Sequence, residues 1–369
     1  MIHFFKNKAP EEFWNYLSDL DTSEVKAWAV EEGRAIFPKV PVMRVEGPLI
    51  ICQLLETTLL NLLNYPCLVA TNAARHVLAA GKGKEILEFG TRRAQGPDGA
   101  MSASRYSYLG GVHGTSNVKA AQAFHIPCKG THAHAYVGSF SDFSELPTRG
   151  LGDCEDFVGI VLNWRQKLGA IDTIDGELVA FISYAQAFPN GFLALIDTYD
   201  TLLSGVMNFM CVALALDEAG YRAIGIRLDS GDLAYLSKRV RKIFTDNAKK
   251  FDAPWLEKCT IVASNDITEE VLFSLKEQNH EIDSFGIGTN LVTCKTQPAL
   301  GMVYKLVELN GQPRIKLSDE IEKTTIPGRK NVYRILNKNG EPIMDMVREA
   351  NNSIIRKLLF EEIIDKLSN

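Results

Sequence analysis

The chain has 369 residues, 46% of them hydrophobic, and a formal net charge of −5. This length suits one large domain with appendages or two domains, and this composition is normal for a protein that buries a sizeable core. The charges form no long run of one sign, so the basic face typical of nucleic-acid-binding proteins is not expected. The opening residues, MIHFFKNKAP, lack the apolar region of a signal peptide.

Two apolar stretches, 57–74 and 201–216, are expected to be buried helices rather than membrane spans. The second is short, and the first contains three asparagines and Pro66, whereas a span needs about 20 mostly apolar residues. The seven cysteines are scattered, and none forms a CxxC pair. We therefore expect reduced thiols in the core of a cytosolic protein that has neither a membrane nor a nucleic acid as a partner.

Residues 1–35 are expected to be largely helical, 36–49 to form an irregular strand segment, and a long helix to follow to about residue 82. Beyond it, short apolar runs end in a glycine or a small polar residue, and helical patterns usually follow them. The runs are EILEFGTRR (85–93), IPCKGTHAH (126–134), FLALIDTYD (192–200), RAIGIRLDSGD (222–232), CTIVASNDI (259–267) and DSFGIGTN (283–290). This alternation predicts a parallel sheet, and its length favours a (β/α) barrel over a minimal Rossmann domain.

Polar residues follow nearly every one of these proposed strands. In a barrel, the carboxyl ends of the strands meet on one face, where the functional site is built. The alternative is that these residues are polar only because loops generally are. The residues are Thr91, Arg92, Arg93, Thr131, His132, His134, Asp197, Asp200, Arg227, Asp229, Asn265, Asp266, Thr289 and Asn290.

His132 and His134 form an HxH pair, which begins the ligand set of many metal-dependent hydrolases. Such a site needs further ligands from later strands. The only later histidine, His280, lies in a helical pattern, so the hydrolase interpretation is weak. A carboxylate-rich Mg²⁺ site remains open, because hard cations prefer oxygen ligands.

Arg227 places a guanidinium at the mouth of an apolar strand. Its burial is costly unless it meets an anion, and its planar fork suits a carboxylate or a phosphate. A structural ion pair with Asp229 or Asp232 is equally compatible with the spacing. The segment GIGTN (286–290) can present backbone amides and a threonine hydroxyl to a phosphate. Together these features predict an enzyme acting on an anionic, phosphorylated substrate.

Several long motifs occur in the same order as in eukaryotic-type nicotinate phosphoribosyltransferases, which the chain resembles over essentially its whole length. They are ILEFGTRRAQGPDGAMSASRYSYLGG (86–111), GTHAHAYVGSF (130–140), GIRLDSGDL (225–233), VASNDI (262–267) and GIGTN (286–290), with further similarity in 45–75 and 323–334. The resemblance implies a type II phosphoribosyltransferase fold, which is an irregular (β/α) barrel with a second α+β domain. Expected domains are an N-terminal flanking segment (1–82), the barrel core (83–300) and a C-terminal segment that packs back on the flanking domain (301–369).

The resemblance also implies a reaction. Nicotinate and phosphoribosyl pyrophosphate would give nicotinate mononucleotide and pyrophosphate, coupled to ATP hydrolysis, with Mg²⁺ or Mn²⁺ as cofactor and a homodimer as the working form. By position, His134 matches the histidine that ATP phosphorylates, and Thr131 and Arg227 match the nicotinate site. Gly288 and Thr289 match the site for phosphoribosyl pyrophosphate.

Further contacts to phosphate, ribose or Mg²⁺ are expected from four charged residues at the proposed strand ends. Arg92, Arg93 and Asp229 are assigned to phosphoribosyl pyrophosphate, and Asp266 is assigned to the metal.

Two alternatives accompany this expectation. Nicotinamide phosphoribosyltransferase is a close relative in which an aspartate follows the Gly-Thr pair and contacts the neutral amide. Here His132 holds that place, which favours nicotinate. The second alternative concerns length, because family members are longer at both ends and carry an N-terminal tyrosine motif that reaches the neighbouring subunit. No counterpart is evident before residue 45, so the second alternative is a non-catalytic form that pairs with a full-length subunit.

Overall fold

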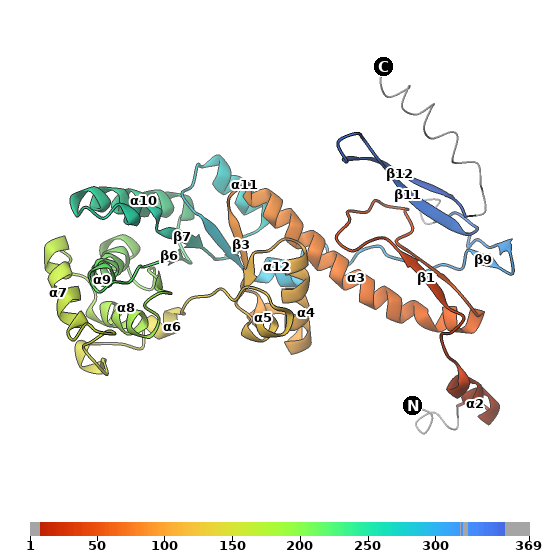
Figure 1. Ribbon diagram of the computed structural model, residues 1–369, viewed down its shortest axis with the longest axis horizontal. Coiled ribbons are helices and arrows are strands. Elements are labelled where there is room, and N and C mark those ends of the chain that lie inside the picture. Colours follow the sequence, from red (N-terminus) through yellow and green to blue (C-terminus); the bar gives the residue numbers. More distant parts are fainter. Residues whose placement is uncertain (1–7, 318, 320–323, 351–369) are drawn as a thin grey trace, which may run out of the picture. The chain divides into compact units, whose positions relative to one another are not determined.

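The computed structural model describes residues 8–317, 319 and 324–350 (Figure 1). The chain divides into two compact units: Met1–Asn64 together with Gly301–Asn369, called the flanking unit here, and Tyr65–Leu300, called the barrel unit. The division falls inside the long helix α3 (Leu49–Ala80), which contains Pro66. The expected domain boundaries at residues 82 and 300 stay predictions.

The barrel unit is built on one curled sheet of six strands in the order β4-β3-β8-β7-β6-β5, and every pairing is parallel. Strands β3, β6 and β7 are labelled in Figure 1. The strands are β3 (Glu85–Glu88), β4 (Gly114–Thr115), β5 (Leu193–Leu195), β6 (Gly225–Leu228), β7 (Thr260–Ala263) and β8 (Ser284–Ile287). They are short and almost entirely buried, as expected for parallel strands covered on both faces. The predicted α/β fold is confirmed, and the irregular (β/α) barrel that was expected takes the form of a curled parallel sheet of the half-barrel kind.

One predicted strand is wrong. Residues 126–134 form only an isolated parallel bridge, between Cys128 and Thr115 of β4. The strand that precedes them, β4, has two residues, Gly114 and Thr115, and is too short to give an apolar periodicity. The 126–134 segment instead passes from edge strand β4 to the opposite edge strand β5, where the His132 Nε2 atom accepts the Leu195 N–H at 3.1 Å. A side chain thus occupies the position of a neighbouring strand at this edge.

Helices pack around the sheet, and four of them begin at a residue whose side chain accepts a backbone N–H. Asn117, Asp156, Asp232 and Thr268 are such caps, each satisfying one of the free amides at a helix start. The α-helices are α4 (Gly96–Leu109), α5 (Val118–Phe124), α6 (His134–Val137), α7 (Phe157–Leu168), α8 (Asp175–Ala187), α9 (Val206–Glu218), α10 (Leu233–Lys250), α11 (Glu269–Glu277) and α12 (Thr289–Thr293). The shorter turns are η1 (Thr91–Arg93), η2 (Phe143–Glu145), η3 (Thr201–Gly205) and η4 (Pro254–Lys258).

One stretch, Thr201–Glu218, is long and apolar enough to cross a membrane by length and composition alone. It forms η3 and α9, and its α9 residues, such as Phe209 and Met210, are fully buried in the core. Phe209 stacks on Phe192 with ring centroids 5.6 Å apart. The expectation of a buried helix at 201–216 is therefore confirmed.

The flanking unit contains the helix α2 (Glu11–Asp19) and three antiparallel strand pairs. These pairs are β1 (Lys26–Ala29) and β2 (Met43–Glu46), β9 (Glu308–Leu309) and β10 (Gln312–Pro313), and β11 (Lys330–Leu336) and β12 (Pro342–Glu349). Strand β1 corrects the expectation that 1–35 is largely helical. In the β1–β2 pair Trp28 lies opposite Arg44, and the Arg44 guanidinium lies over the Trp28 ring at 4.0 Å. Arg44 also donates to the Lys330 carbonyl at 2.8 Å, which joins the N-terminal and C-terminal parts of this unit.

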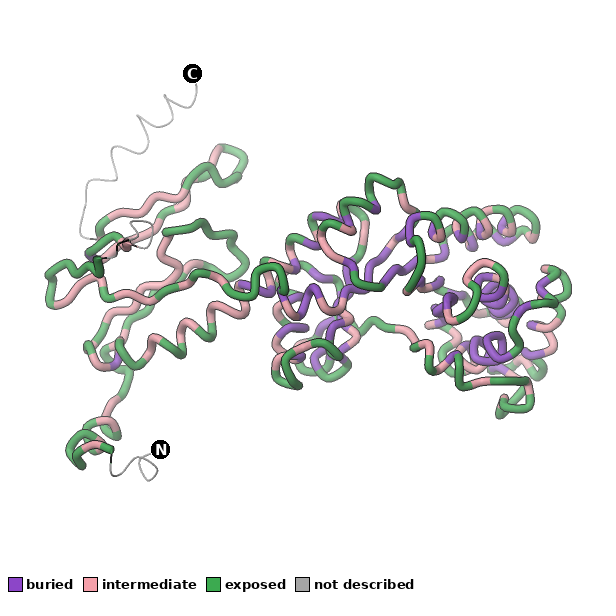
Figure 2. Tube along the Cα trace, turned by 180° about the vertical axis from the view of Figure 1, so that it is seen from behind, coloured by how far each residue is buried: buried purple, intermediate pink, exposed green. Residues whose placement is uncertain are grey.

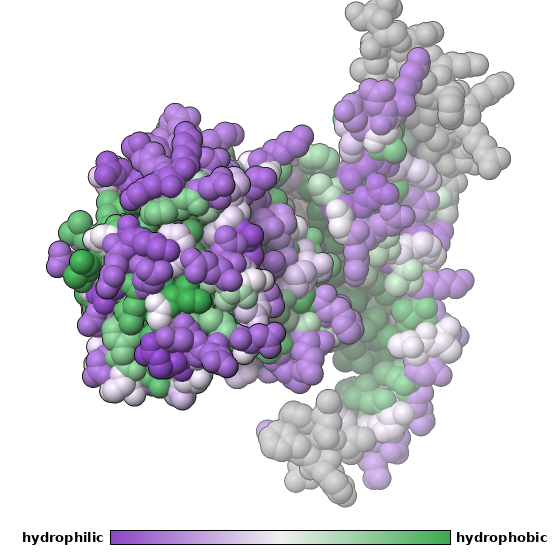
Figure 3. Space-filling model, turned by 60° about the vertical axis from the view of Figure 1, so that its left-hand side comes forward, coloured by the Kyte–Doolittle hydropathy of each residue, from purple (hydrophilic) through white to green (hydrophobic). Residues whose placement is uncertain are grey.

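The two units differ in how much they bury. Figure 2 shows buried residues concentrated in the barrel unit, whereas the flanking unit is mostly intermediate or exposed. Among its described residues only Ile51 and Gly328 are buried. Figure 3 shows hydrophobic side chains in patches among hydrophilic ones on the face it presents. The flanking unit therefore has little hydrophobic core of its own in the single chain.

Candidate functional site

The candidate site lies at the carboxyl edge of the curled sheet, as the sequence predicts. The strands are parallel, so the residues that follow β3, β5, β6, β7 and β8 all emerge at the same edge. Arg92 and Arg93 follow β3, and Asp197 follows β5. Asp229, Asp266 and the Gly288–Thr289 pair follow β6, β7 and β8 in the same way.

His134 is the first residue of α6, and its ring is held on two sides. Its Nδ1 atom lies 3.0 Å from the Thr198 hydroxyl oxygen. Its Nε2 atom lies 3.5 Å from a carboxylate oxygen of Asp229 and 3.9 Å from one of Asp197. The side chain is 42% exposed. His134 is therefore oriented by Thr198 and two carboxylates while remaining accessible to a ligand.

Asp197 holds the loops after β5 and β6 together. Its Oδ2 atom accepts the Asp229 backbone N–H at 2.7 Å and the Ser230 hydroxyl at 2.6 Å. Its side chain is only 1% exposed, and its Oδ1 atom has no hydrogen-bond partner among the described residues. Asp229 in turn accepts a hydrogen bond from the Ser264 hydroxyl. The two carboxylates are thus fixed next to His134.

Arg227 lies on β6, and its guanidinium reaches the segment that carries the histidines. Its Nη2 atom donates to the His132 carbonyl at 3.1 Å, and its buried Nε has no partner within the described parts of the chain. Burial lowers the pKa of Arg227, as does the charge of Arg92, while Asp229 and Asp197 act in the opposite direction. A mostly buried guanidinium with a free donor is suited to binding an anion.

His132 is enclosed by aromatic rings. The Tyr184 ring lies 4.8 Å away in an edge-on arrangement, and Tyr136 lies at 5.5 Å. Burial, assisted by the charges of Arg227 and His134 but opposed by the Ala133 backbone, lowers the pKa of His132 to about 4. The ring is therefore neutral at physiological pH, and its Nε2 lone pair accepts the Leu195 N–H.

The loops after β3 and β8 meet through two glycines. A Cβ atom on Gly90 would lie 2.8 Å from the Gly288 carbonyl oxygen and would also collide with Val292. The close approach therefore requires glycine at position 90. Arg92 and Arg93 follow in η1 and are exposed. The contact places the turn that carries Arg92 and Arg93 beside Gly288. This proximity is required if Arg92, Arg93 and Gly288 are to bind the same ligand.

Two predicted site residues lack direct links to this cluster. The Thr131 hydroxyl bonds the adjacent His132 carbonyl at 3.1 Å. Asp266 is exposed in the turn after β7 and has a positive φ of 44°, like Asn265 before it at 94°. Asn290, another of the strand-end residues, serves the fold, because its amide donates to the Ile267 carbonyl at 2.7 Å. The roles of Thr131 and Asp266 stay predictions.

A metal ion held by the protein alone needs several ligand atoms close together. Across residues 8–317, 319 and 324–350, no group of three or more His, Cys, Asp or Glu side chains is placed to hold a metal ion. Asp197 and Asp229 nevertheless offer carboxylate oxygens at the site, one of them buried without a partner. Mg²⁺ is typically held by one or two carboxylates together with substrate phosphates. Asp197 and Asp229 therefore fit a Mg²⁺ ion that is also bound by substrate phosphates, and not a metal ion coordinated by protein side chains alone.

The sequence did not single out Thr198 or Glu88. Thr198 stands in the run LIDTYD, in which only the aspartates were proposed as site residues. Its hydrogen bond to His134 depends on the fold, which brings the two residues together. Glu88 ends the apolar run of β3 and is fully buried. An acidic residue at the end of a buried strand was the signal that could have found it.

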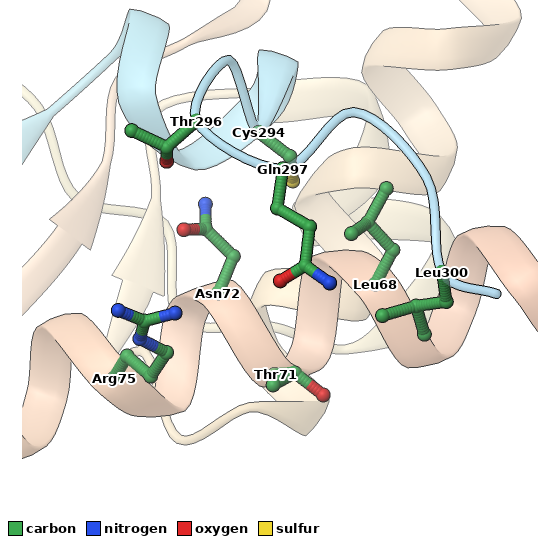
Figure 4. Close-up of a pocket in the computed structure, with 8 residues that line it drawn as sticks. All are labelled: Leu68, Thr71, Asn72, Arg75, Cys294, Thr296, Gln297 and Leu300. Atoms are coloured by element: carbon green, nitrogen blue, oxygen red, sulfur yellow. The ribbon is translucent and has the colours of Figure 1, made fainter. Parts of the chain in front are cut away.

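A separate cavity of about 20 Å³ lies between α3 and the segment after α12. In Figure 4, Asn72 points from α3 toward Thr296, and Gln297 points back toward the helix. A cavity of this volume accommodates about one water molecule. It is too small for a nucleotide precursor and is not a substrate site.

Comparison with known proteins places the chain in a family. The model for the nicotinate phosphoribosyltransferase (NAPRTase) family matches residues 85–188 and 214–351, and the model for its N-terminal domain matches 2–64.

Two curated relatives illustrate the similarity. The nicotinate phosphoribosyltransferase of Dictyostelium discoideum is 57% identical over 360 residues, covering 96% of this chain and 61% of the relative. The human nicotinate phosphoribosyltransferase is 48% identical over 354 residues, covering 93% and 66%. The chain thus spans somewhat less than two thirds of the length of these two relatives.

Solved structures agree with the sequence comparison. The crystal structure of human nicotinic acid phosphoribosyltransferase superposes with a TM-score of 0.82 at 43% identity, covering 96% of this chain and 69% of that one. A nicotinate-nucleotide pyrophosphorylase from Pyrococcus furiosus, at 24% identity, shares the fold with a TM-score of 0.63. By sequence and by structure, this chain belongs to the nicotinate phosphoribosyltransferase family.

Proposed function

We propose that the chain forms nicotinate mononucleotide and pyrophosphate from nicotinate and phosphoribosyl pyrophosphate, a step of NAD biosynthesis. The observation that carries this proposal is Arg227, a mostly buried guanidinium at the carboxyl end of β6 whose Nε lacks a partner among the described residues. A pyridine carboxylate would supply the anion that such a group favours. The relatives described above, which carry the name of this activity, support the same assignment.

Nicotinate fits this site better than nicotinamide does. The position after the Gly-Thr pair holds His132, whose pKa is lowered to about 4. A neutral imidazole does not repel a carboxylate, whereas an aspartate there would. The Arg227 charge then decides between the two ligands, because it interacts more strongly with a carboxylate than with an amide.

Phosphoribosyl pyrophosphate is assigned to the loops after β3 and β8. Arg92, Arg93 and the Gly288–Thr289 pair would contact its phosphates, and Asp229 its ribose. Departure of pyrophosphate leaves positive charge on the ribose, so positioning and charge stabilisation supply most of the catalysis. Mg²⁺ or Mn²⁺, bound with the phosphates, would neutralise their charge, and Asp266 or the Asp197–Asp229 pair would hold it.

ATP is assigned as a co-substrate that phosphorylates His134. With Nδ1 engaged by Thr198, Nε2 is the nitrogen available to attack the γ-phosphorus. The N–P bond forms as the bond from that phosphorus to the β-phosphate oxygen breaks, and ADP leaves. Nε2 attacks through its lone pair, so the ring proton lies on Nδ1, which donates to the Thr198 hydroxyl oxygen. Asp229, 3.5 Å from Nε2, is the nearest group to remove any proton that Nε2 carries before the attack. The phosphoryl group adds charge and acceptors at the rim of the site.

Two measurements test the assignments. Incubation with ATP labelled at the γ-phosphate should leave acid-labile label on the protein, and the His134→Ala variant should not be labelled; equal labelling of both proteins would remove the role of His134. Formation of nicotinate mononucleotide by the purified chain alone would establish the activity. Product that appears only after a full-length family member is added would instead support the non-catalytic alternative.

We also propose that the chain acts as a homodimer in the cytosol. Within the described residues of the flanking unit, only Ile51 and Gly328 are buried, while Leu54, Leu62 and Val303 are 59 to 61% exposed. Apolar surface of this kind is typical of subunit interfaces. Sedimentation velocity should give the mass of two chains, and a Leu54→Glu/Leu62→Glu variant should shift the species toward one chain. A monomeric wild-type protein at micromolar concentration would contradict the proposal.

A further inference from the structure

Glu88, the last residue of β3, is a carboxylate with no exposed surface. One of its oxygens, Oε1, accepts the Gly90 backbone N–H. The other, Oε2, accepts the hydroxyl groups of Ser104 at 2.7 Å and Thr115 at 2.6 Å. No salt bridge to Glu88 occurs within the part of the chain that the structure describes. A buried carboxylate without a cation is costly unless hydrogen bonds satisfy it, so these donors hold the side chain in one position.

A second set of contacts fixes the donors. The Asn117 amide donates to the Ser104 hydroxyl oxygen at 3.1 Å, and the Asn117 backbone N–H donates to Thr115 Oγ1 at 3.0 Å. The same Asn117 side chain caps α5 by accepting the Ala120 N–H at 3.1 Å. Glu88 is therefore the centre of a network that ties β3 to α4, β4 and α5. The network is fully inside the protein and has few alternative arrangements.

The network ends at the turn that carries the arginines. Glu88 binds the Gly90 N–H, and the Gly90 carbonyl accepts the Arg93 N–H at 2.8 Å. Gly90 also lies directly against Gly288, where an added Cβ would meet the carbonyl oxygen at 2.8 Å. Glu88 thus acts at the point where the loops after β3 and β8 touch.

We propose that Glu88 is a positioning residue that fixes the Gly90–Arg93 turn against Gly288, and so sets the geometry in which both loops bind the phosphates of one ligand. The identity of that ligand rests on the proposed function. Glu88 itself lies beneath the loops and does not touch the ligand. Its effect is expected on the binding of phosphoribosyl pyrophosphate and not on the binding of nicotinate, which is assigned to Arg227.

Two substitutions separate positioning from general stability. Glu88→Ala removes the acceptor for all three donors. Glu88→Gln keeps the shape: its amide oxygen can accept the Gly90 N–H, and its amide nitrogen can donate to the hydroxyl oxygens, since hydroxyl groups also accept. Glu177→Ala is the matched control, because Glu177 is equally buried but bonds Ser204 and Asn208. Thr115→Val, which removes one donor, serves if Glu88→Ala does not fold.

The first readout is hydrogen–deuterium exchange of the 90–94 amides without ligand. Exchange should increase in Glu88→Ala, to a lesser degree in Thr115→Val, and stay near wild type in Glu88→Gln and Glu177→Ala. The second readout is calorimetric titration with phosphoribosyl pyrophosphate and with nicotinate. Glu88→Ala should weaken the former about tenfold, as expected for loss of about one well-made hydrogen bond, and change the latter by less than about twofold.

The outcomes are distinguishable. Unchanged exchange in Glu88→Ala, or equal loosening of residues 90–94 by Glu177→Ala, would overturn the positioning role. Equal loss of both ligands would do so as well. If the wild-type protein fails to bind phosphoribosyl pyrophosphate, the proposed function fails, while the exchange measurement still decides whether Glu88 fixes the turn.

Discussion

The Nδ1 atom of His134 lies 3.0 Å from the hydroxyl oxygen of Thr198. The two residues are 64 positions apart in the sequence, and they meet because the loop after β5 and the start of α6 share the carboxyl edge of the sheet. This hydrogen bond restricts rotation of the imidazole and leaves Nε2 facing Asp229. Orientation of the acceptor is as necessary as its identity when a phosphoryl group is transferred.

Replacing Thr198 by valine should therefore slow phosphorylation of His134. Loss of one hydrogen bond that orients the ring corresponds to about 1 kcal/mol, or a rate lower by about fivefold to tenfold. The measurement is the initial rate of acid-labile labelling from ATP. Thr198→Ser keeps the hydroxyl and should label at nearly the wild-type rate, so a slow serine variant would argue against this hydrogen bond as the cause.

Replacing Arg227 by alanine should weaken nicotinate far more than nicotinamide. Hydrogen bonds between charged groups contribute roughly 1.5 to 3 kcal/mol, so the dissociation constant for nicotinate should rise about 10- to 150-fold. Calorimetric titration with each ligand measures the difference. Arg222→Ala is the control, since that arginine pairs with Asp217 at 2.9 Å on the surface. A similar loss for both ligands would remove the carboxylate role of Arg227.

The stability of the fold should depend on pH through Glu177. Burial raises the pKa of Glu177 to about 7 from an ordinary value of 4.5, although hydrogen bonds from Ser204 and Asn208 oppose the shift. Between these two values the folded state holds a proton that the unfolded state has released. The free energy of unfolding should therefore decrease as the pH rises from 4.5 to 7.

Glu177→Gln mimics the protonated acid and should lack this dependence. The difference in unfolding free energy between the variant and the wild type should grow across this window by at most roughly 3 kcal/mol. Urea unfolding at pH 4.5 and pH 8 measures it, and the exposed Glu155→Gln serves as control. A constant difference between Glu177→Gln and wild type at both pH values would contradict the buried, protonated state.

His132 should titrate in the opposite sense. Its pKa is lowered to about 4 from 6.5. As the pH falls between these values, the His132 ring therefore becomes protonated in the unfolded state but stays neutral in the folded state. The contribution of His132 to stability is therefore complete above pH 6.5 and is lost toward pH 4. In proton NMR, the His132 ring, assigned by comparison with His132→Gln, should keep neutral-imidazole shifts down to about pH 5. A midpoint near 6.5 would show that the ring is not buried as described.

The sequence predicted much of the fold because the strands are short, apolar and bounded by glycine or polar residues. Five of the six predicted strands overlap β3, β5, β6, β7 and β8. The sixth prediction failed because residues 126–134 are attached to the sheet by one bridge at Cys128 and by the His132 ring. Strand β4, with Gly114 and Thr115 alone, offers no periodicity to detect.

The candidate site was predicted in outline for a related reason. Residues at the ends of parallel strands must share one edge, so Arg227 and Asp229 could be grouped without knowledge of the contacts. His134 was grouped with them through the strand wrongly expected at 126–134. Which of them touch could not be predicted, because that depends on the order of strands in space. Thr198 was missed because a threonine next to aspartates carries no motif of its own, whereas the signal for Glu88, an acid at the end of an apolar run, was present but not used.

The sequence by itself determined the family, the parallel α/β architecture and the residue types at the sheet edge, because motifs and hydrophobic periodicity are local properties of the chain. Tertiary structure alone decided the partners: His134 with Thr198, Arg227 with the His132 carbonyl, and Glu88 with Gly90, Ser104 and Thr115. Those contacts join segments up to 95 positions apart. They arise from how the sheet curls and how its edges are bridged, which no local pattern encodes.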